Sequence, residues 1–319
     1  MDTTVLFKYR SVTACMKASY ELMSHHLTSL FKKTWWAMLI YAVFVAFTIY
    51  FRLPNKALHD WGEASPWSSY IIQTFIYLGV WVTGIVSCTA VWVWFKKRSV
   101  SFRKTLIRFA LLSILFDFIL GLVLGGFTGG VSSFYQGYAA HAATDNPMIQ
   151  VGAAADGSSW MANGAIGAIL GIVFVALMLL ICIPFANIIP QVMLKEQGEK
   201  WNLWKSYKMG LRHFGSIFKM SFLGSIILAI ILFVVSIPAM LLCWAQVASQ
   251  LGALNGDPLG VPAYFPILTF IVFTLTVFVV SYAFTWLNIS YIYLFGANQT
   301  LEEKKLEEKK LEEKKLEEK

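Results

Sequence analysis

The chain has 319 residues, of which 57% are hydrophobic, 16% are aromatic and only 14% are charged, with a mean hydropathy of +0.62. A soluble domain carries roughly a quarter charged residues, so this composition excludes an ordinary globular protein. The formal net charge is +8, yet no basic tail or interleaved RNA-binding signature accompanies it. We therefore expect membrane lipids, and not nucleic acid, as partners of the basic residues.

Residues 1–33 predict an amphipathic helix that lies along the cytoplasmic leaflet of a membrane. Apolar side chains recur at three- and four-residue spacing from Val5 to Leu30, while Lys8 and Lys17 lie away from that stripe. A cleavable signal peptide has a short basic stretch and then an uninterrupted apolar core, which this segment lacks. The segment is therefore expected to stay on the mature chain.

Six apolar stretches follow, each long enough to cross a bilayer as a helix. They cover about residues 35–51, 70–95, 105–132, 161–189, 217–247 and 264–295. Loops are expected at residues 53–69, 134–160 and 248–263, which are polar or rich in small residues. The sequence thus predicts an all-α, polytopic membrane domain over residues 34–295.

The positions of the basic residues predict the orientation. Nineteen Lys and Arg precede Leu301, and 17 of them fall in the N-terminal segment, residues 96–108 and residues 195–219. Lys and Arg in short loops remain on the cytoplasmic side, so both termini are expected there. The basic residues expected to make topology or lipid-headgroup contacts are Lys32, Lys33, Arg103, Lys104, Arg108, Lys205, Lys208, Arg212 and Lys219.

A basic amphipathic segment before the fifth span repeats an earlier one. Shifting the chain by 187 residues matches Ser19-Tyr20 with Ser206-Tyr207 and His26 with His213, among six identities in about 14 positions. A weaker copy lies at residues 101–109. Each copy leads directly into a span, so we expect three two-helix units, each with a basic lead-in helix.

The pattern Ser-aromatic followed by Leu-x-Arg/His-Phe thus stands before an odd-numbered span three times, over about residues 15–295. In this pattern the chain resembles bacterial six-span membrane proteins without an assigned activity, such as the membrane domain fused to some glycerophosphodiester phosphodiesterases. The soluble phosphodiesterase domain is absent, so the resemblance transfers no catalytic residue. It implies a multi-pass protein of the bacterial inner membrane.

Three polar side chains within the spans are candidates for an intramembrane site: Asp117, Asn187 and Asn288. Polar groups at this depth are costly and mark solute or proton pathways, although hydrogen bonding between helices is an alternative role for all three. Asp117 cannot pair with Arg108, which lies on the opposite helix face about 13 Å away. A partner from another helix is expected, with Lys219, His213 or Asn288 as candidates.

The segment 296–319 predicts a charged, helical, cytoplasmic tail. Its Leu-Glu-Glu-Lys-Lys repeat places leucine every five residues. Successive leucines are about 140° apart around a helix, so no apolar stripe forms and a coiled coil is not expected. Ion pairs at i,i+3 and i,i+4 favour a solvated single helix, and docking of a partner is the alternative.

The sequence contains no phosphate-binding loop, nucleophile motif, zinc motif or paired catalytic carboxylates. We therefore expect a protein that is not an enzyme and that holds no cofactor and no metal. The preferred hypothesis is that it moves or accommodates a small or lipidic solute between its repeats. The alternative is a scaffold or regulatory subunit that docks a cytoplasmic or membrane protein partner. A lipid-modifying enzyme would require His213, Lys219 and Asp117 to converge.

Overall fold

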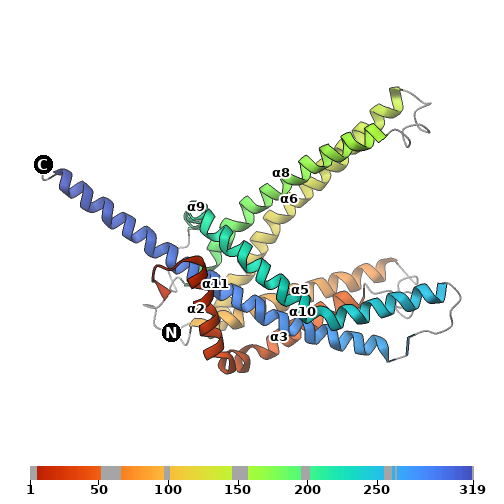
Figure 1. Cartoon of the computed structure of the whole chain (residues 1–319), viewed down its shortest axis with the longest axis horizontal. Coiled ribbons are helices and arrows are strands. Elements are labelled where there is room, and N and C mark those ends of the chain that lie inside the picture. The colour runs from red at the N-terminus through yellow and green to blue at the C-terminus, as the bar shows by residue number, and fades with distance from the viewer. Residues whose placement is uncertain are drawn as a thin grey trace.

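The computed structural model describes residues 6–51, 66–96, 101–145, 157–194, 202–254, 261–262 and 264–317. In this part the chain forms eight helices and no strand. They are α2 (Val12–His25), α3 (Leu27–Tyr50), α5 (Pro66–Lys96), α6 (Phe102–Asp145), α8 (Gly157–Leu194), α9 (Leu203–Arg212), α10 (Phe214–Leu254) and α11 (Phe265–Glu317) (Figure 1).

Six of these helices, α3, α5, α6, α8, α10 and α11, are long and apolar enough to cross a membrane. About 20 apolar residues suffice for a span, and each of the six contains such a stretch. The prediction of an all-helical protein with six apolar helices is therefore confirmed for the described residues. The chain has the composition and helix lengths of a multi-pass membrane protein.

The prediction that the first amphipathic helix extends to residue 33 is wrong. Helix α2 stops at His25, and α3 begins at Leu27 and continues into the first span. His26 lies between them with φ −116° and ψ 18°, outside the helical region. Lys32 and Lys33 therefore belong to the helix that contains the span, about two turns beyond the break.

The long loop expected at residues 134–160 is also wrong where the structure describes it. Helix α6 continues to Asp145 and α8 begins at Gly157, so residues 134–145 and 157–160 are helical; residues 146–156 lie outside the described part. Polar and small residues suggested a loop, but alanine is the best helix former. The first helix breaker is Pro147, and helices usually end before the residue that precedes a proline.

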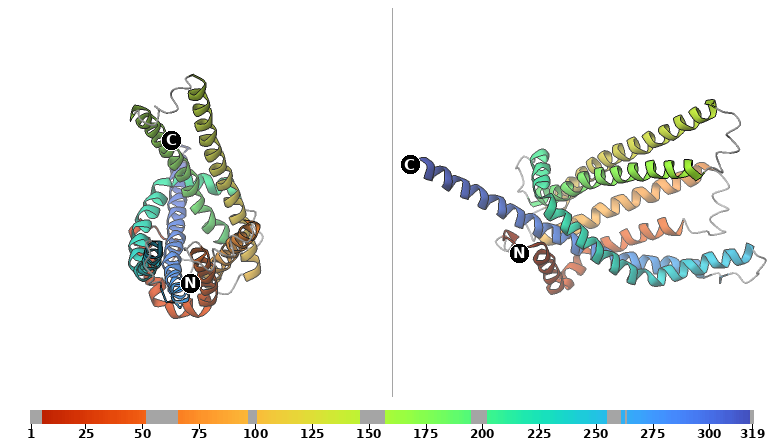
Figure 2. Two further views of the ribbon diagram at one scale, coloured as in Figure 1. Left: turned by 90° about the vertical axis from the view of Figure 1, so that its right-hand side faces the viewer. Right: turned by 45° about the horizontal axis from the view of Figure 1, so that its top comes forward.

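The six long helices contact one another in a closed order. Helix α3 packs on α5, α5 on α6, α6 on α8, α8 on α10, α10 on α11, and α11 on α3. Beyond these contacts the α6/α8 pair diverges from the other four helices as a separate arm (Figures 1 and 2). The charged end of α11 extends away on the opposite side, as one continuous helix with the sixth span.

Most of the buried apolar side chains lie where the helices meet, near α2 and α9; we call this region the junction. Its core includes Trp92 from α5, Leu112 from α6, Ile183 from α8, Met220 from α10 and Ile292 from α11. A second, much smaller cluster joins Ala46, Ala239 and Phe273 further along α3, α10 and α11. Tertiary packing is thus concentrated at one end of the spans.

Helix α2 is fixed on α11 by a buried pair of hydroxyls. Ser19 Oγ and Ser290 Oγ lie 2.6 Å apart, and both residues are completely buried. One hydroxyl donates to the other, and the second can donate to a backbone carbonyl, of Met16 or of Trp286. Trp286 Nε1 also donates to the Met16 carbonyl at 3.4 Å. Buried hydroxyls that are fully paired specify one packing arrangement.

Helix α9 is fixed on α8 at a proline. Pro184 has no N–H, so the carbonyl of Leu180 one turn earlier loses its partner within the helix. Tyr207 on α9 donates its hydroxyl to that carbonyl at 3.2 Å. Gly210 lets α9 approach closely, because a Cβ there would lie 2.7 Å from the Pro184 carbonyl oxygen and 2.9 Å from its Cα. A side chain of α9 therefore supplies the hydrogen bond that the proline removes from α8.

We predict that Gly210→Ala lowers the free energy of unfolding by about 1–3 kcal/mol, because the added methyl overlaps the backbone at Pro184. The measurement is thermal unfolding of the purified chain in detergent. Gly215→Ala is the matched control, since a Cβ there meets nothing within 4 Å. That variant should be neutral or up to about 1 kcal/mol more stable. Equal effects of the two substitutions would contradict the close approach of α9 to α8.

Candidate functional site

Asp117 is on α6 and forms its hydrogen bonds with α5 and with its own helix. Trp81 Nε1 on α5 donates to Asp117 Oδ2 at 2.7 Å, and Ser113 Oγ lies 3.4 Å from the same oxygen. The partner from another helix is thus a tryptophan, and the expectation of Lys219, His213 or Asn288 is wrong. The physical reason is that α6 packs against α5, whereas those three residues lie on or beside α10 and α11.

Asn187 and Asn288 occupy different environments. Asn187 on α8 is 4% exposed, and its Nδ2 has no hydrogen-bond partner. Asn288 on α11 is exposed and lines a cavity of about 190 Å³. Neither Asn187 nor Asp117 lines that cavity, and Asp117 is exposed elsewhere on α6. The structure therefore does not bring the three predicted residues together around this cavity.

The cavity beside Asn288 lies between α5, α6, α8 and α11. Its other walls are Cys88, Val91, Trp92, Phe109, Ala186, Ile189, Pro190 and Tyr291. Most of these are apolar, while the Tyr291 hydroxyl is 2.6 Å from Ser221 Oγ. An apolar cavity with a few converging polar groups is the usual form of a small-molecule site.

A second polar group of this cavity is a backbone carbonyl. Pro190 lies inside α8 and has no N–H, so the carbonyl of Ala186, four residues earlier, has no partner within the helix. Both residues line the cavity with Asn288. In a membrane, non-bonded backbone groups occur where they line a cavity or contact protein. The Asn288 amide and the Ala186 carbonyl together offer one or two donors and acceptors to a bound group.

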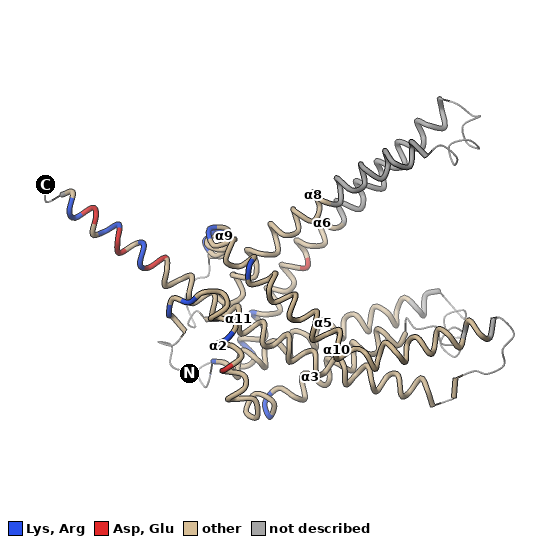
Figure 3. The backbone as a smooth tube through the Cα atoms, in the orientation of Figure 1, with Lys and Arg blue, Asp and Glu red and all other residues tan. Residues whose placement is uncertain are grey.

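The predicted basic contacts gather near the junction, as Figure 3 shows for the Lys and Arg outside the charged end of α11. Arg108 is half-buried, and its Nη1 lies 3.5 Å from the Val192 carbonyl in the last turn of α8. The other eight are exposed: Lys32, Lys33, Arg103, Lys104, Lys205, Lys208, Arg212 and Lys219. Of these eight, Arg212 is paired with a carboxylate, Glu302.

The arrangement that sequence reasoning missed is a cluster around Glu302, the first carboxylate after the sixth span. Its Oε1 lies 3.1 Å from Nε2 of His213, and its Oε2 lies 2.9 Å from Nη1 of Arg212. His213 separates α9 from α10, and it is 7% exposed. The start of the charged tail is therefore bound to the helix break before the fifth span. The only signal in the sequence was the position of Glu302 directly after the span.

His213 is held in a mixed environment. Burial lowers its pKa, and Glu302 opposes this by favouring the charged ring. Lys305 from α11 and Arg212 from α9 are like charges and lower the pKa further. The net direction is downward, so the folded state favours the neutral ring, which can still donate one hydrogen bond to Glu302.

The described residues give little basis for bond-breaking chemistry. No three His, Cys, Asp or Glu side chains lie close enough together there to hold a metal ion. Asp117 and His213, two members of the set that a lipid-modifying enzyme would need, hydrogen-bond to Trp81 and Glu302 respectively, and Lys219 is exposed. The features that the described residues bring together are a mostly apolar cavity with polar groups and clusters of charge at the junction.

Comparison of the chain with known proteins found no relative. No protein-family model matches the chain, and no curated protein or solved structure matches it.

We predict that the stability of the protein falls as the pH is lowered below about 6.5, in part because His213 must take up a proton. A histidine whose pKa is lowered on folding stabilises the fold fully above its unfolded pKa, and this contribution is lost as the pH falls. His213→Asn cannot titrate and should weaken the decline, by at most about 1.4 kcal/mol per pH unit. The measurement is thermal unfolding between pH 7.5 and pH 5.

His26→Asn is the matched control, because His26 separates α2 from α3 and its ring is exposed. The stability of this variant should depend on pH as that of the wild-type chain does. All other titrating groups are common to the two variants, so their contribution cancels when the variants are compared. The assignment is contradicted if His213→Asn and His26→Asn give the same pH dependence.

Proposed function

We propose that this chain is a non-catalytic, multi-pass protein of a bacterial inner membrane that accommodates a small or lipidic solute between its helix pairs. The observation that carries the proposal is the cavity beside Asn288, which this exposed residue lines together with mostly apolar side chains and with Ala186 and Pro190 of α8. A polar group in the apolar part of a span is costly unless it has a function or a partner.

The divergence of the α6/α8 arm supports a lipidic solute. On the described part of α8, Ile172 is 69% exposed, Val173 57% and Val175 56%. On α10, Phe222 and Ile230 are similarly exposed, at 61% and 60%. Inside a membrane such surfaces are covered by acyl chains, so the space beside the arm is open to lipid. The apolar body of a solute can reach the cavity from the bilayer without crossing water.

The charge distribution supports a cytoplasmic junction. Of the 19 Lys and Arg before Leu301, 17 lie in the segments around α2, between α5 and α6, and around α9. Because Lys and Arg near short loops favour the cytoplasm, we place the junction and both termini on that side. The cavity beside Asn288 would then open near the inner leaflet.

An organisation in three repeats is also part of the proposal. His26 and His213 are 187 residues apart, and each separates an amphipathic helix from a span, with φ −116° and −103°. Helix α2 packs on α11, the last helix of the third pair, and α9 packs on α8, the last helix of the second pair. These two lead-in helices thus contact the returning helix of the preceding pair, counted cyclically. Such an arrangement suits neighbouring repeats that bury their faces against one another. The expected third lead-in helix is wrong, because residues 102–109 are the first turns of α6 itself.

A scaffold or regulatory subunit is the second function, and one observation favours it. Helix α11 continues without a break to Glu317, and Leu306, Leu311 and Leu316 on it are 56–74% exposed. A continuous helix that projects from the junction could present the charged tail to a partner protein. A solvated spacer helix would have the same exposed leucines, so this observation favours the scaffold less than the cavity favours a bound solute.

The test is photo-crosslinking with a defined lipid. The full chain is reconstituted in vesicles of phosphatidylethanolamine and phosphatidylglycerol that contain a phosphatidylethanolamine with a diazirine in its acyl chain. We expect crosslinks in the peptides that carry Cys88 to Trp92 and Ala186 to Pro190. Asn288→Leu keeps the side-chain size but removes the amide. It should reduce these crosslinks about fivefold, because a lost hydrogen bond of about 1 kcal/mol weakens binding by about that factor.

Phe284→Leu is the control, since Phe284 is 52% exposed on the same helix and does not line the cavity. That variant should leave the crosslinks at the cavity unchanged. The proposal fails if wild-type crosslinks are spread evenly over the exposed helices, or if Asn288→Leu has no effect. A protein partner that copurifies only with chains retaining residues 301–319 would then favour the scaffold.

A further inference from the structure

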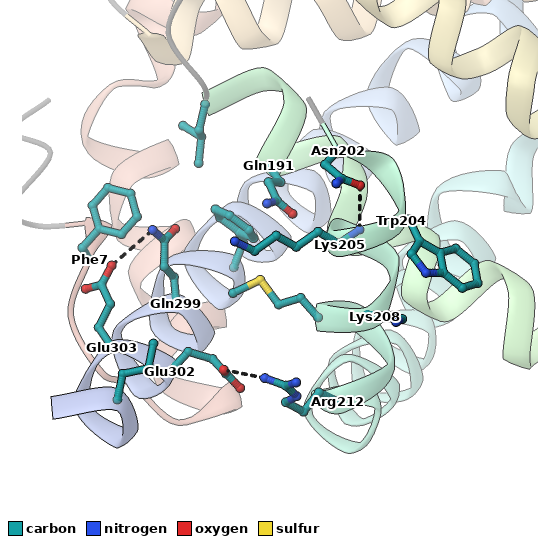
Figure 4. Close-up of a pocket in the computed structure, with 14 residues that line it drawn as sticks. Phe7, Gln191, Asn202, Trp204, Lys205, Lys208, Arg212, Gln299, Glu302 and Glu303 are labelled. Atoms are coloured by element: carbon teal, nitrogen blue, oxygen red, sulfur yellow. Dashed lines mark hydrogen bonds and ion pairs between the residues drawn. The ribbon is translucent and has the colours of Figure 1, made fainter. Parts of the chain in front are cut away.

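A second and larger cavity lies at the junction, separate from the one beside Asn288. Its volume is about 820 Å³, and its walls come from α9, the last turn of α8, the start of the α11 tail and Phe7 (Figure 4). Volumes of about 300–1,000 Å³ are typical of ligand sites. No residue is shared between the two cavities. The larger cavity is therefore a second candidate site, independent of the first.

The charged groups of this cavity are divided between its two walls. Lys205, Lys208 and Arg212 come from α9, and Glu302 and Glu303 come from α11 (Figure 4). Arg212 and Glu302 neutralise each other through their 2.9 Å ion pair. Glu303 Oε1 accepts a hydrogen bond from Gln299 at 3.3 Å on its own wall. Glu303 keeps its negative charge on the α11 wall, so the cavity is lined by three positive and two negative side chains. The positive excess lies on the α9 wall.

The two lysines carry that excess. Lys208 Nζ lies 5.5 Å from the centre of the Trp204 ring, and neither Lys208 nor Lys205 has an ion pair with another described residue. Both residues line the cavity and are three residues apart on α9; Lys205 extends into the cavity, whereas the Lys208 ammonium lies beside Trp204 (Figure 4). Because lysine side chains rotate freely on their four-carbon stems, a phosphate in the cavity can draw both ammonium groups toward it. An ammonium pair of this kind can bind one phosphate through charge-assisted hydrogen bonds.

An unpartnered amide lies in the same cavity. Gln191, in the last turn of α8, lines it, and its Oε1 is buried with no hydrogen-bond partner. A buried acceptor without a partner is costly, and a ligand that binds it removes this cost. Because the two ends of an amide can exchange, Gln191 can offer either a donor or an acceptor to a ligand.

The remaining walls are apolar. Leu194, Met209, Phe295 and Leu306 line the cavity together with Phe7. A free inorganic phosphate would leave this surface in contact with water, whereas a phosphate ester with an apolar body would cover it. The chemistry of the walls therefore matches an amphiphile better than a simple anion.

We propose that this cavity binds a phosphate-bearing amphiphile, with the phosphate held by Lys205 and Lys208 and the apolar body against Met209 and Phe295. Arg212 serves a different purpose, since its charge is already bound by Glu302. The ligand can come from the membrane, as a phospholipid, or from solution, as a soluble phosphate ester. The two sources share the same chemistry at the lysines.

The test is the thermal unfolding of the purified full chain in an uncharged detergent, titrated with four probes. These are dioctanoylphosphatidylglycerol, dioctanoylglycerol, sn-glycerol 3-phosphate and inorganic phosphate. A ligand that binds only the folded state raises the unfolding temperature in proportion to its affinity and concentration. We expect dioctanoylphosphatidylglycerol to stabilise the wild-type chain. In the double variant Lys205→Gln/Lys208→Gln the apparent affinity should fall by about tenfold or more.

Two matched variants keep the result interpretable. Lys309→Gln/Lys310→Gln removes the same charge from the exposed tail and should bind as the wild type does. Lys205→Arg/Lys208→Arg keeps the charge and should retain binding, which separates loss of charge from loss of fold. Stabilisation by the phospholipid alone would identify a membrane source, and additional but weaker stabilisation by sn-glycerol 3-phosphate would identify a soluble phosphate ester as a second source. Stabilisation by sn-glycerol 3-phosphate or inorganic phosphate equal to that by the phospholipid would contradict the contacts of an apolar body with Met209 and Phe295.

Three further outcomes would overturn the proposal. The first is the absence of stabilisation by any phosphate-bearing probe. The second is equally tight binding of dioctanoylglycerol, which lacks the phosphate. The third is equal weakening in the Lys205/Lys208 and Lys309/Lys310 double variants. None of these results bears on the cavity beside Asn288, so the two proposals fail or stand separately.

Discussion

A helix that crosses a membrane has to pair every backbone carbonyl within the protein, and α8 cannot do this alone. Pro184 and Pro190 leave the carbonyls of Leu180 and Ala186 without a partner in the helix. The first is bound by the Tyr207 hydroxyl of α9, and the second lies at a cavity. The two prolines thus determine where α9 sits and where a polar cavity opens.

Both cavities depend on this short part of α8. Ala186, Ile189 and Pro190 line the cavity beside Asn288, while Gln191 and Leu194, just beyond them, line the larger cavity under α9. Helix α9 is in turn joined to the tail through His213 and Glu302. A ligand in the larger cavity would contact α8, α9 and α11 together, so its binding and the position of the tail are coupled through shared contacts.

The helical class and the six spans could be predicted from the sequence, because composition and stretch length directly reflect the cost of placing polar groups in lipid. The end of α6 could not be predicted in the same way. The polar and small residues of segment 134–145 predict a loop, whereas its alanines favour the helix that forms. Partners across helices were also missed: Trp81 for Asp117 and Glu302 for His213. Spacing along one helix does not indicate which helices are neighbours in space.

The pairing of Tyr207 with the Leu180 carbonyl can be tested by a double-mutant cycle with Pro184→Ala. Alanine restores the N–H at position 184, which can bond to Leu180 and make the hydroxyl dispensable. In thermal unfolding, Tyr207→Phe should cost about 1 kcal/mol beside Pro184 and close to nothing in the Pro184→Ala background. An equal cost in both backgrounds would contradict the claim that α9 completes the interrupted helix.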